Sequence, residues 1–196
     1  MQHMLSHHIA KPHCNYVRVV RCDPVHSDFH ARFDCVKRTY CYRLTLAPHD
    51  AGLFEAQHAW SLAQALDLDR MHAACQLLTG EHDFAAFRNV GCIAKSTIRT
   101  LDLSLSTVAH DAFDSVRLHG AVDEVRGIGR QHVFIRAESR SFLYRQVRLM
   151  VAALVDVGSR RRTLADVRAC LDTGTQQPFP IKPAPAHGLY FVAAHY

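Results

Sequence analysis

The sequence lacks any long hydrophobic run. Its longest apolar stretch, Leu149 to Val155, ends at Asp156, whereas a transmembrane helix needs about 20 apolar residues. The first fifteen residues are rich in His and hold no apolar signal-peptide core. We therefore expect no membrane partner and an intracellular protein. The cytoplasm is the expected compartment, and the mitochondrion and the nucleus stay open as alternatives.

Several common site motifs are also missing. The seven Cys include no Cys-x-x-Cys pair, and their odd number and irregular spacing favour reduced thiols over a disulfide framework. None of the fifteen His stands in a His-Glu-x-x-His or Cys/His zinc spacing, and His7 and His8 are interpreted as part of a flexible tail. No glycine-rich phosphate loop and no Gly-x-Ser-x-Gly elbow is present. The sequence therefore predicts no metal site.

Lysine is scarce, because Arg provides 19 of the 23 basic residues, and the net charge is +5 with an isoelectric point near 8.9. The planar guanidinium offers several donors to a phosphate, so this bias mildly favours a nucleic-acid partner. Charge alone fits equally well with a basic surface that has no such role.

Alternation of apolar and polar residues predicts the strands. The segments concerned are residues 16–21, 37–46, 98–108, 113–118, 132–137 and 188–194. Helical stripes predict three helices, at residues 69–79, 141–157 and 163–171. Either Asp67 or Asp69 can cap the first helix, and Thr163 with Asp166 can cap the third. This order predicts an α+β fold, with an antiparallel sheet and helices on one face. The domain is expected at residues 16–196, after a flexible tail at residues 1–15.

Four separate segments resemble one family, the TruA-type tRNA pseudouridine synthases. They match its FHARF and RxYxY, GxHDFxxF, KxxxR and FLxxxVRxxVxxLxxVG patterns. The matching residues are 28–33 with 38–43, 80–88, 95–100 and 142–158, with Gly188–Val192 beyond them. They occur in the family's order and at similar spacing, so the resemblance covers roughly residues 15–196.

The resemblance implies an activity and a fold. The family isomerises uridine to pseudouridine in tRNA: the glycosidic C–N bond breaks, the base turns over, and a C–C bond forms. No cofactor is required. The implied fold is one half of a pseudouridine synthase, similar to a ferredoxin-like domain, and the implied partners are tRNA and a second copy in a homodimer.

The family's catalytic Asp stands in an Arg-Thr-Asp-x-Gly-Val-His setting before the FHARF segment. No Asp of this sequence has that setting. Asp102 comes nearest to this pattern, but an extra residue separates it from Arg99-Thr100, and no Gly follows it. We therefore expect this chain to be the C-terminal half, to lack the nucleophilic Asp and to be inactive alone.

Two residues match catalytic positions of the family. The resemblance gives Tyr40 the role of stacking on the flipped uracil or of taking part in proton transfer. Periodicity alone fits a core tyrosine, which is the role expected for Tyr42. Arg148 matches the arginine that pairs with the catalytic Asp, because a carboxylate in a closed pocket needs a cationic partner to stay ionised. Without the resemblance, Arg148 would be interpreted as a solvated helix charge.

The resemblance also assigns contacts around the site. Expected contacts to tRNA phosphates are Arg32, Arg88, Lys95 and Arg99, with ordinary surface charge as the alternative. Expected pocket-lining residues are Phe142, Leu143 and Leu189. Core roles are expected for Phe84 and Phe87, and a place in the core at the cleft floor for Phe29 and Phe33. The run Arg160–Arg162 is interpreted as a solvated helix start.

Other functions remain in competition. The absent Asp also fits a non-catalytic RNA-binding module that kept the fold, and the α+β pattern alone fits a ferredoxin-like interaction domain without RNA affinity. Many bacterial members carry His, His and Met where this chain has Tyr144, Arg145 and Gln146. The modified tRNA position therefore stays open.

Overall fold

A computed structural model gives the fold, and it describes residues 19–46, 55–109, 131–176 and 180–196. The chain divides into two compact units, Met1–Asp34 and Cys35–Tyr196. The predicted tail at residues 1–15 and the predicted strand at 113–118 lie outside the described residues.

The described part of the first unit, residues 19–34, contains no strand and no helix. The strand predicted at 16–21 is therefore wrong for residues 19–21, because alternation makes a strand only where a neighbouring strand supplies hydrogen bonds. A turn is closed by His30, whose carbonyl accepts from the Phe33 N–H at 3.0 Å. Phe33 is 67% exposed, so its predicted core role is also wrong.

The second unit is built on a six-stranded sheet. The strands lie in the order β2 (Trp60–Leu62), β1 (Lys37–Leu46), β5 (Gln131–Ser139), β4 (Ile98–Ala109) and β3 (Gly80–Asp83). The sixth strand, β6 (Leu189–His195), pairs with the first part of β1, and β2 pairs with its last three residues. Only the β1–β2 pair is parallel among the described strands. The predicted α+β fold is confirmed, with one parallel pair added to the antiparallel sheet. The short strands β2 and β3 were not predicted.

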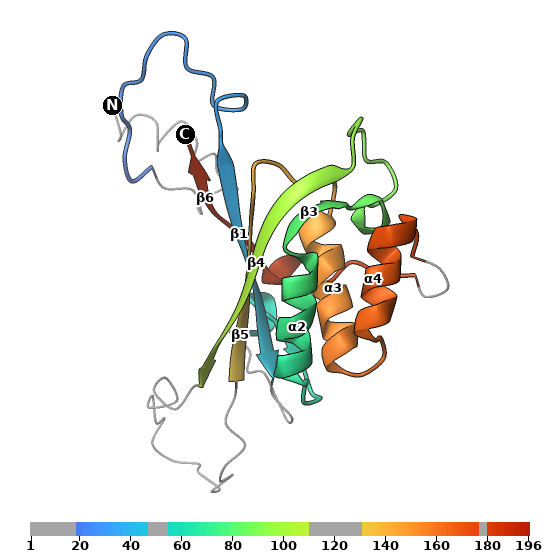
Figure 1. The fold of residues 1–196 in the computed structure, drawn as a ribbon. Helices are drawn as coiled ribbons and strands as arrows, with labels where there is room; N and C mark the ends of the chain where they lie inside the picture. The colour runs from blue at the N-terminus through green and yellow to red at the C-terminus, as the bar shows by residue number, and fades with distance from the viewer. Residues whose placement is uncertain (1–18, 47–54, 110–130, 177–179) are drawn as a thin grey trace, which may run out of the picture. The chain divides into compact units, whose positions relative to one another are not determined.

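Three helices cover one face of this sheet (Figure 1). They are α2 (Leu68–Leu78), α3 (Gln146–Gly158) and α4 (Leu164–Thr173), and single 3-10 turns lie at η1 (Glu55–Gln57), η2 (Ala85–Phe87) and η3 (Ala186–Gly188). The predicted caps are confirmed: Asp67 accepts from the Arg70 N–H, and Thr163 and Asp166 form a capping box. Within the described residues, no helix combines the length and the apolar character needed to span a bilayer.

Helix α3 begins at Gln146, five residues after the predicted start. Arg145 has φ +58°, a left-handed conformation that cannot continue a helix. The Gln146 side chain accepts from the Leu143 N–H at 2.7 Å and so stabilises the turn before the helix. The residues just before α3 therefore form a separate, hydrogen-bonded turn and are not the first turn of the helix.

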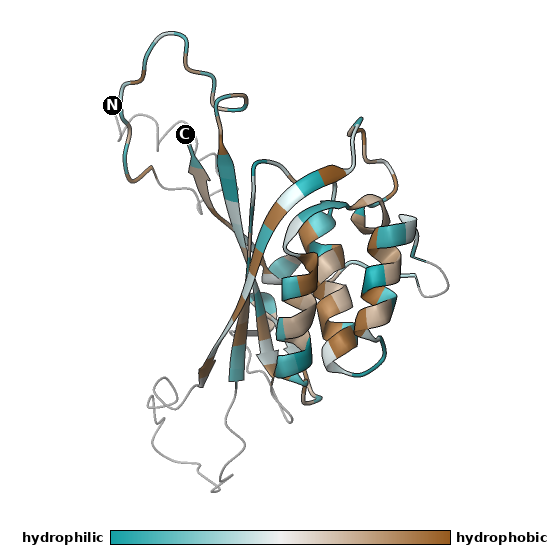
Figure 2. Cartoon of the chain, viewed as in Figure 1, coloured by the Kyte–Doolittle hydropathy of each residue, from teal (hydrophilic) through white to brown (hydrophobic). Residues whose placement is uncertain are grey.

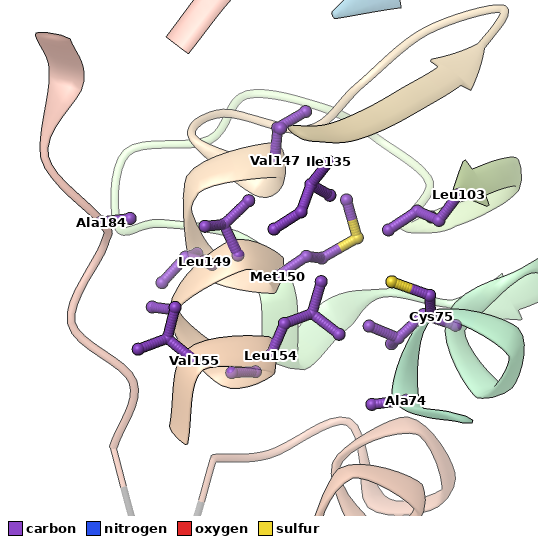
Figure 3. Packing of buried hydrophobic residues seen from close by; sticks show 14 of the residues in the cluster. Ala74, Cys75, Leu103, Ile135, Val147, Leu149, Met150, Leu154, Val155 and Ala184 are labelled. Atoms are coloured by element: carbon purple, nitrogen blue, oxygen red, sulfur yellow. The ribbon is translucent and has the colours of Figure 1, made fainter. Parts of the chain in front are cut away.

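The core lies between α3 and the sheet. Met150 and Leu154 of α3 pack toward Ile135 of β5 and Leu103 of β4, with Cys75 of α2 beside them (Figure 3). The helices carry hydrophobic residues, drawn in brown, where they pack together, and hydrophilic residues, drawn in teal, on their outer surfaces (Figure 2). Burial of this apolar stripe holds α3 in place, and α3 in turn positions the side chains at its first turn.

Strand alternation separates the two faces of the sheet. On β5, Val133, Ile135 and Ala137 are buried, whereas Arg136 is exposed and Glu138 only partly covered. Phe84 and Phe87 are fully buried, which confirms their predicted core role. Arg162 is 4% exposed, so the solvated helix start predicted for it is wrong, since it turns inward near Asp156.

Candidate active site

Tyr40 lies in the N-terminal half of β1, on the helix-covered face that it shares with Tyr42. Its ring meets those of Phe142 and Phe191 edge to face, with centroids 5.2 and 5.3 Å away. The β1–β6 register shifts beside it, since Thr39 pairs with Ala193 and Tyr40 with Phe191. Such bulges redirect side chains, and they are common beside functional sites. Tyr40 is only half-buried.

Tyr42, two residues further along β1, is fully buried. Its hydroxyl donates to the Pro185 carbonyl at 2.7 Å, and burial raises the pKa of this phenol well above its ordinary value. The packing role predicted for Tyr42 is confirmed. A Cβ at Gly188 would lie 2.8 Å from the Tyr42 ring, so only glycine allows η3 to approach this closely.

Arg148 lies in the first turn of α3 and is half-buried. Its Nε donates to the Ala184 carbonyl at 2.6 Å, and the Ala184 N–H donates to the Arg148 carbonyl at 3.1 Å. The positive charge of Arg148 is close enough to the Tyr42 hydroxyl to oppose part of the rise in its pKa. Arg148 and Tyr40 therefore face the same side of the sheet.

The guanidinium of Arg148 has no acidic partner in the described part of the chain. Its hydrogen bonding there is limited to Nε, which leaves the two terminal nitrogens available. A half-buried cation is more stable beside an anion than without one. The geometry of Arg148 thus fits the recognition of a carboxylate by two parallel hydrogen bonds.

The apolar residues expected at the pocket take different positions. Phe142 is half-buried against Tyr40. Leu143 is 3% exposed and belongs to the core. Leu189 is half-buried and pairs with Tyr42 across the β1–β6 ladder.

Two of the four predicted phosphate contacts, Arg88 and Lys95, lie on the connection between η2 and β4, and Arg99 follows as the second residue of β4. Arg88 and Lys95 are exposed, and Arg99 is half-buried, with Nη1 donating to the Ser96 carbonyl at 3.0 Å. Arg32 is exposed and belongs to the first unit, where its guanidinium lies 5.7 Å from the Phe33 ring.

An open groove of about 580 Å³ lies where β1 and β4 begin and β5 ends. Arg99 is the only predicted site residue in its lining, which also contains Lys37 and Arg140. Glu138 in the same groove accepts from Lys37 at 2.9 Å and from Arg136, and these hydrogen bonds lower its pKa to about 2. The sequence could not reveal this cluster, because it depends on the register that sets Glu138 opposite Thr39.

Cys92 is a further residue that motif matching missed. The backbone N–H groups of Tyr144 and Ala94 hydrogen-bond to its sulfur and lower the pKa of the thiol. No spacing in the sequence predicts this, since Tyr144 is distant along the chain. Among the described residues, no three His, Cys, Asp or Glu side chains are grouped as a metal site.

Comparison with known proteins identifies the family. A family model described as tRNA pseudouridine synthase matches residues 74–196, more than half of the chain. The tRNA pseudouridine synthase A of Rhodospirillum centenum is 42% identical over 198 aligned residues, which cover 100% of this chain and 70% of that protein. The chain belongs to the tRNA pseudouridine synthase family.

Two further members of the tRNA pseudouridine synthase family show the same relation. Those of Rhizorhabdus wittichii and Beijerinckia indica are 41% and 39% identical, each over 92% of this chain. This chain spans 62% and 61% of their lengths. The family match at residues 74–196 includes Arg148 and the cationic connection before β4, whereas Tyr40 precedes it.

Proposed function

We propose that the chain supplies part of the active site of an enzyme that isomerises uridine to pseudouridine in tRNA. Tyr40 contacts the flipped base, and Arg148 pairs with a catalytic carboxylate. That carboxylate comes from residues outside this 196-residue sequence. The observation that carries the proposal is the half-buried residue Arg148, whose guanidinium has no acidic partner among the described residues.

Each group has a stated task in this proposal. The Tyr40 ring offers a face or an edge to the uracil, and its hydroxyl is a proton donor or acceptor. The guanidinium keeps the carboxylate ionised, so that it can act as a nucleophile or a base. Arg32, Arg88, Lys95 and Arg99 hold phosphates of the tRNA, and Phe142 and Leu189 limit the access of water to the base.

The test compares the chain alone with a complemented chain. The complement is the part of the Rhodospirillum centenum relative that this chain does not cover, fused or co-expressed. We expect no pseudouridine in unmodified tRNA after incubation with the chain alone, and conversion after complementation. Conversion of uridine by the chain alone would overturn the assignment of the carboxylate.

A second candidate is a non-catalytic RNA-binding module. The observation that favours it is the absence of any Asp in the family's motif setting within this sequence. The complemented protein separates the two functions, because a module that lost its chemistry binds tRNA but leaves its uridines unchanged.

A further inference from the structure

The connection between η2 and β4 carries two aliphatic side chains in an unusual position. Val90 and Ile93 are 93% and 96% exposed, the highest values among the large hydrophobic residues described. The connection projects beyond the helices (Figure 1), and Figure 2 shows brown segments within it. Neither side chain contributes to the core, so their exposure favours a contact with another molecule.

This loop, Arg88–Lys95, is tied to the turn before α3. The Asn89 N–H donates to the Tyr144 carbonyl at 3.1 Å, and the Cys92 N–H donates to the Asn89 carbonyl at 3.2 Å. Gly91 has φ +84°, which allows the chain to reverse between the two exposed residues. The loop therefore presents Val90 and Ile93 from an ordered frame, and Tyr144 lies in the turn before α3, four residues before Arg148.

The charge around the loop has one sign. Arg88 and Lys95 flank it and are exposed, and no acidic residue occurs from Phe84 to Leu101. Apolar side chains between cations complement a strand of RNA, which offers the apolar faces of unstacked bases between phosphates. A purely apolar protein surface would leave both cations without partners.

We propose that the Arg88–Lys95 loop is a wedge that holds open the RNA beside the target uridine. Val90 and Ile93 pack against the bases that lose a stacking neighbour when the uridine flips out, and Arg88 and Lys95 bind the flanking phosphates. This inference rests on the proposed function, since it assigns the loop a place next to the base that Tyr40 contacts.

The test measures the affinity of the full chain for an unmodified tRNA transcript over a range of salt concentrations. We expect Val90→Ser with Ile93→Ser to weaken binding at least tenfold at every salt concentration, because two aliphatic contacts are lost. The slope of affinity against salt should stay unchanged. Arg88→Ser or Lys95→Ser should instead lower that slope by about one.

The matched control is Val108→Ser. Val108 is also an exposed aliphatic residue, but it lies near the other end of β4, roughly 30 Å along the strand from Ile98. The Val108→Ser variant should bind tRNA with the same affinity as the wild type. Because all these side chains are exposed, equal melting temperatures of the variants are expected and should be verified.

The outcomes separate the loop from the proposed function. If the wild type binds tRNA and the double variant binds equally well, the wedge is wrong and the proposed function stands. If the wild-type chain does not bind tRNA, the wedge is overturned, and the complemented protein still tests the proposed function separately. If the double variant changes only the oligomeric state in sedimentation, a second copy occupies the loop, and the wedge is again wrong.

Cys92 provides a second readout in the unmodified chain, because it lies between the two proposed wedge residues. Alkylation by iodoacetamide, followed by mass spectrometry of the Cys92 peptide, should slow severalfold in saturating tRNA. An unchanged rate under saturation would contradict a contact at this loop.

Discussion

At the scale of single residues, the chemistry proposed for the site depends on the surroundings of Tyr40 and Arg148. The Tyr40 ring contacts the rings of Phe142 and Phe191, and the Arg148 side chain donates to one backbone carbonyl. These contacts involve the Tyr40 ring and the Arg148 Nε. Among the described residues, the Tyr40 hydroxyl and the terminal guanidinium nitrogens have no hydrogen-bond partner, so they are available for function.

Replacing Tyr40 by Phe tests the hydroxyl. The Phe ring keeps the edge contacts with Phe142 and Phe191, so the free energy of unfolding should change by less than about 0.5 kcal/mol. The rate constant kcat of the complemented enzyme should fall roughly 10²- to 10⁴-fold, since a proton-transfer group is lost. Full activity of Tyr40→Phe would restrict the role of Tyr40 to stacking.

Glu138 makes stability depend on pH. Its hydrogen bonds from Lys37, Arg136 and Thr39 lower its pKa from 4.5 to about 2. A lowered folded-state pKa stabilises the fold above the unfolded-state pKa, and this stabilisation is lost as pH falls from about 4.5 to about 2. In urea denaturation, Glu138→Gln should flatten the decline in this window. The exposed Asp172→Asn is the control, and a decline that both variants share with the wild type would exclude Glu138 as its source.

The sequence predicted the positions of the individual site and core residues only in part. Family motifs led to Tyr40 and Arg148, and the structure places both on one side of the sheet. The family motifs could not distinguish the buried Leu143 from the half-buried Phe142. The backbone angles of this connection decide which of two adjacent side chains points into the core, and the motifs do not encode these angles. Phe33 shows the same limit, since it was expected in the core at the cleft floor but is 67% exposed.

At the scale of elements, the close approach of η3 to β1 positions the residues of the proposed site. Pro185 accepts from the Tyr42 hydroxyl, and Ala184 binds Arg148 through two hydrogen bonds. This segment therefore links the strand that carries Tyr40 to the helix that carries Arg148.

Gly188→Ala tests this link. The added Cβ would lie 2.8 Å from the Tyr42 ring and 3.0 Å from the Arg43 carbonyl, so either the ring or the backbone must move. We expect a loss of about 1–3 kcal/mol in the free energy of unfolding. Chemical denaturation measures it, and Ala186→Ser, an exposed change in the same turn, is the control. Equal stability of Gly188→Ala and the wild type would show that η3 is not tightly packed.

Periodicity predicted the long elements because their burial patterns are regular. It found the strands at 37–46 and 98–108 and all three helices to within a few residues, except for the start of α3. That start depends on the left-handed Arg145, which no apolar stripe reveals. Strands β2 and β3 are three and four residues long, too short for alternation to be distinguished from chance.

At the scale of the whole molecule, the second unit is a sheet with helices on one face, and its cations are unevenly distributed. The connection from η2 to β4 is purely cationic, whereas Lys37 and Arg136 on the sheet are paired with Glu138. The composition indicated a basic protein, but only the fold shows which cations already have partners.

The central claim is that Arg148 binds the catalytic carboxylate. Its most direct test is kcat for pseudouridine formation in the complemented protein that carries Arg148→Ala, with the exposed Arg168→Ala as control. We predict that kcat falls at least about 100-fold in Arg148→Ala, because removing one partner of a buried charge pair costs roughly 2–5 kcal/mol in interaction free energy. For Arg168→Ala we predict no more than a twofold change in kcat. A kcat of Arg148→Ala within threefold of the wild type, with the fold intact, would contradict the account.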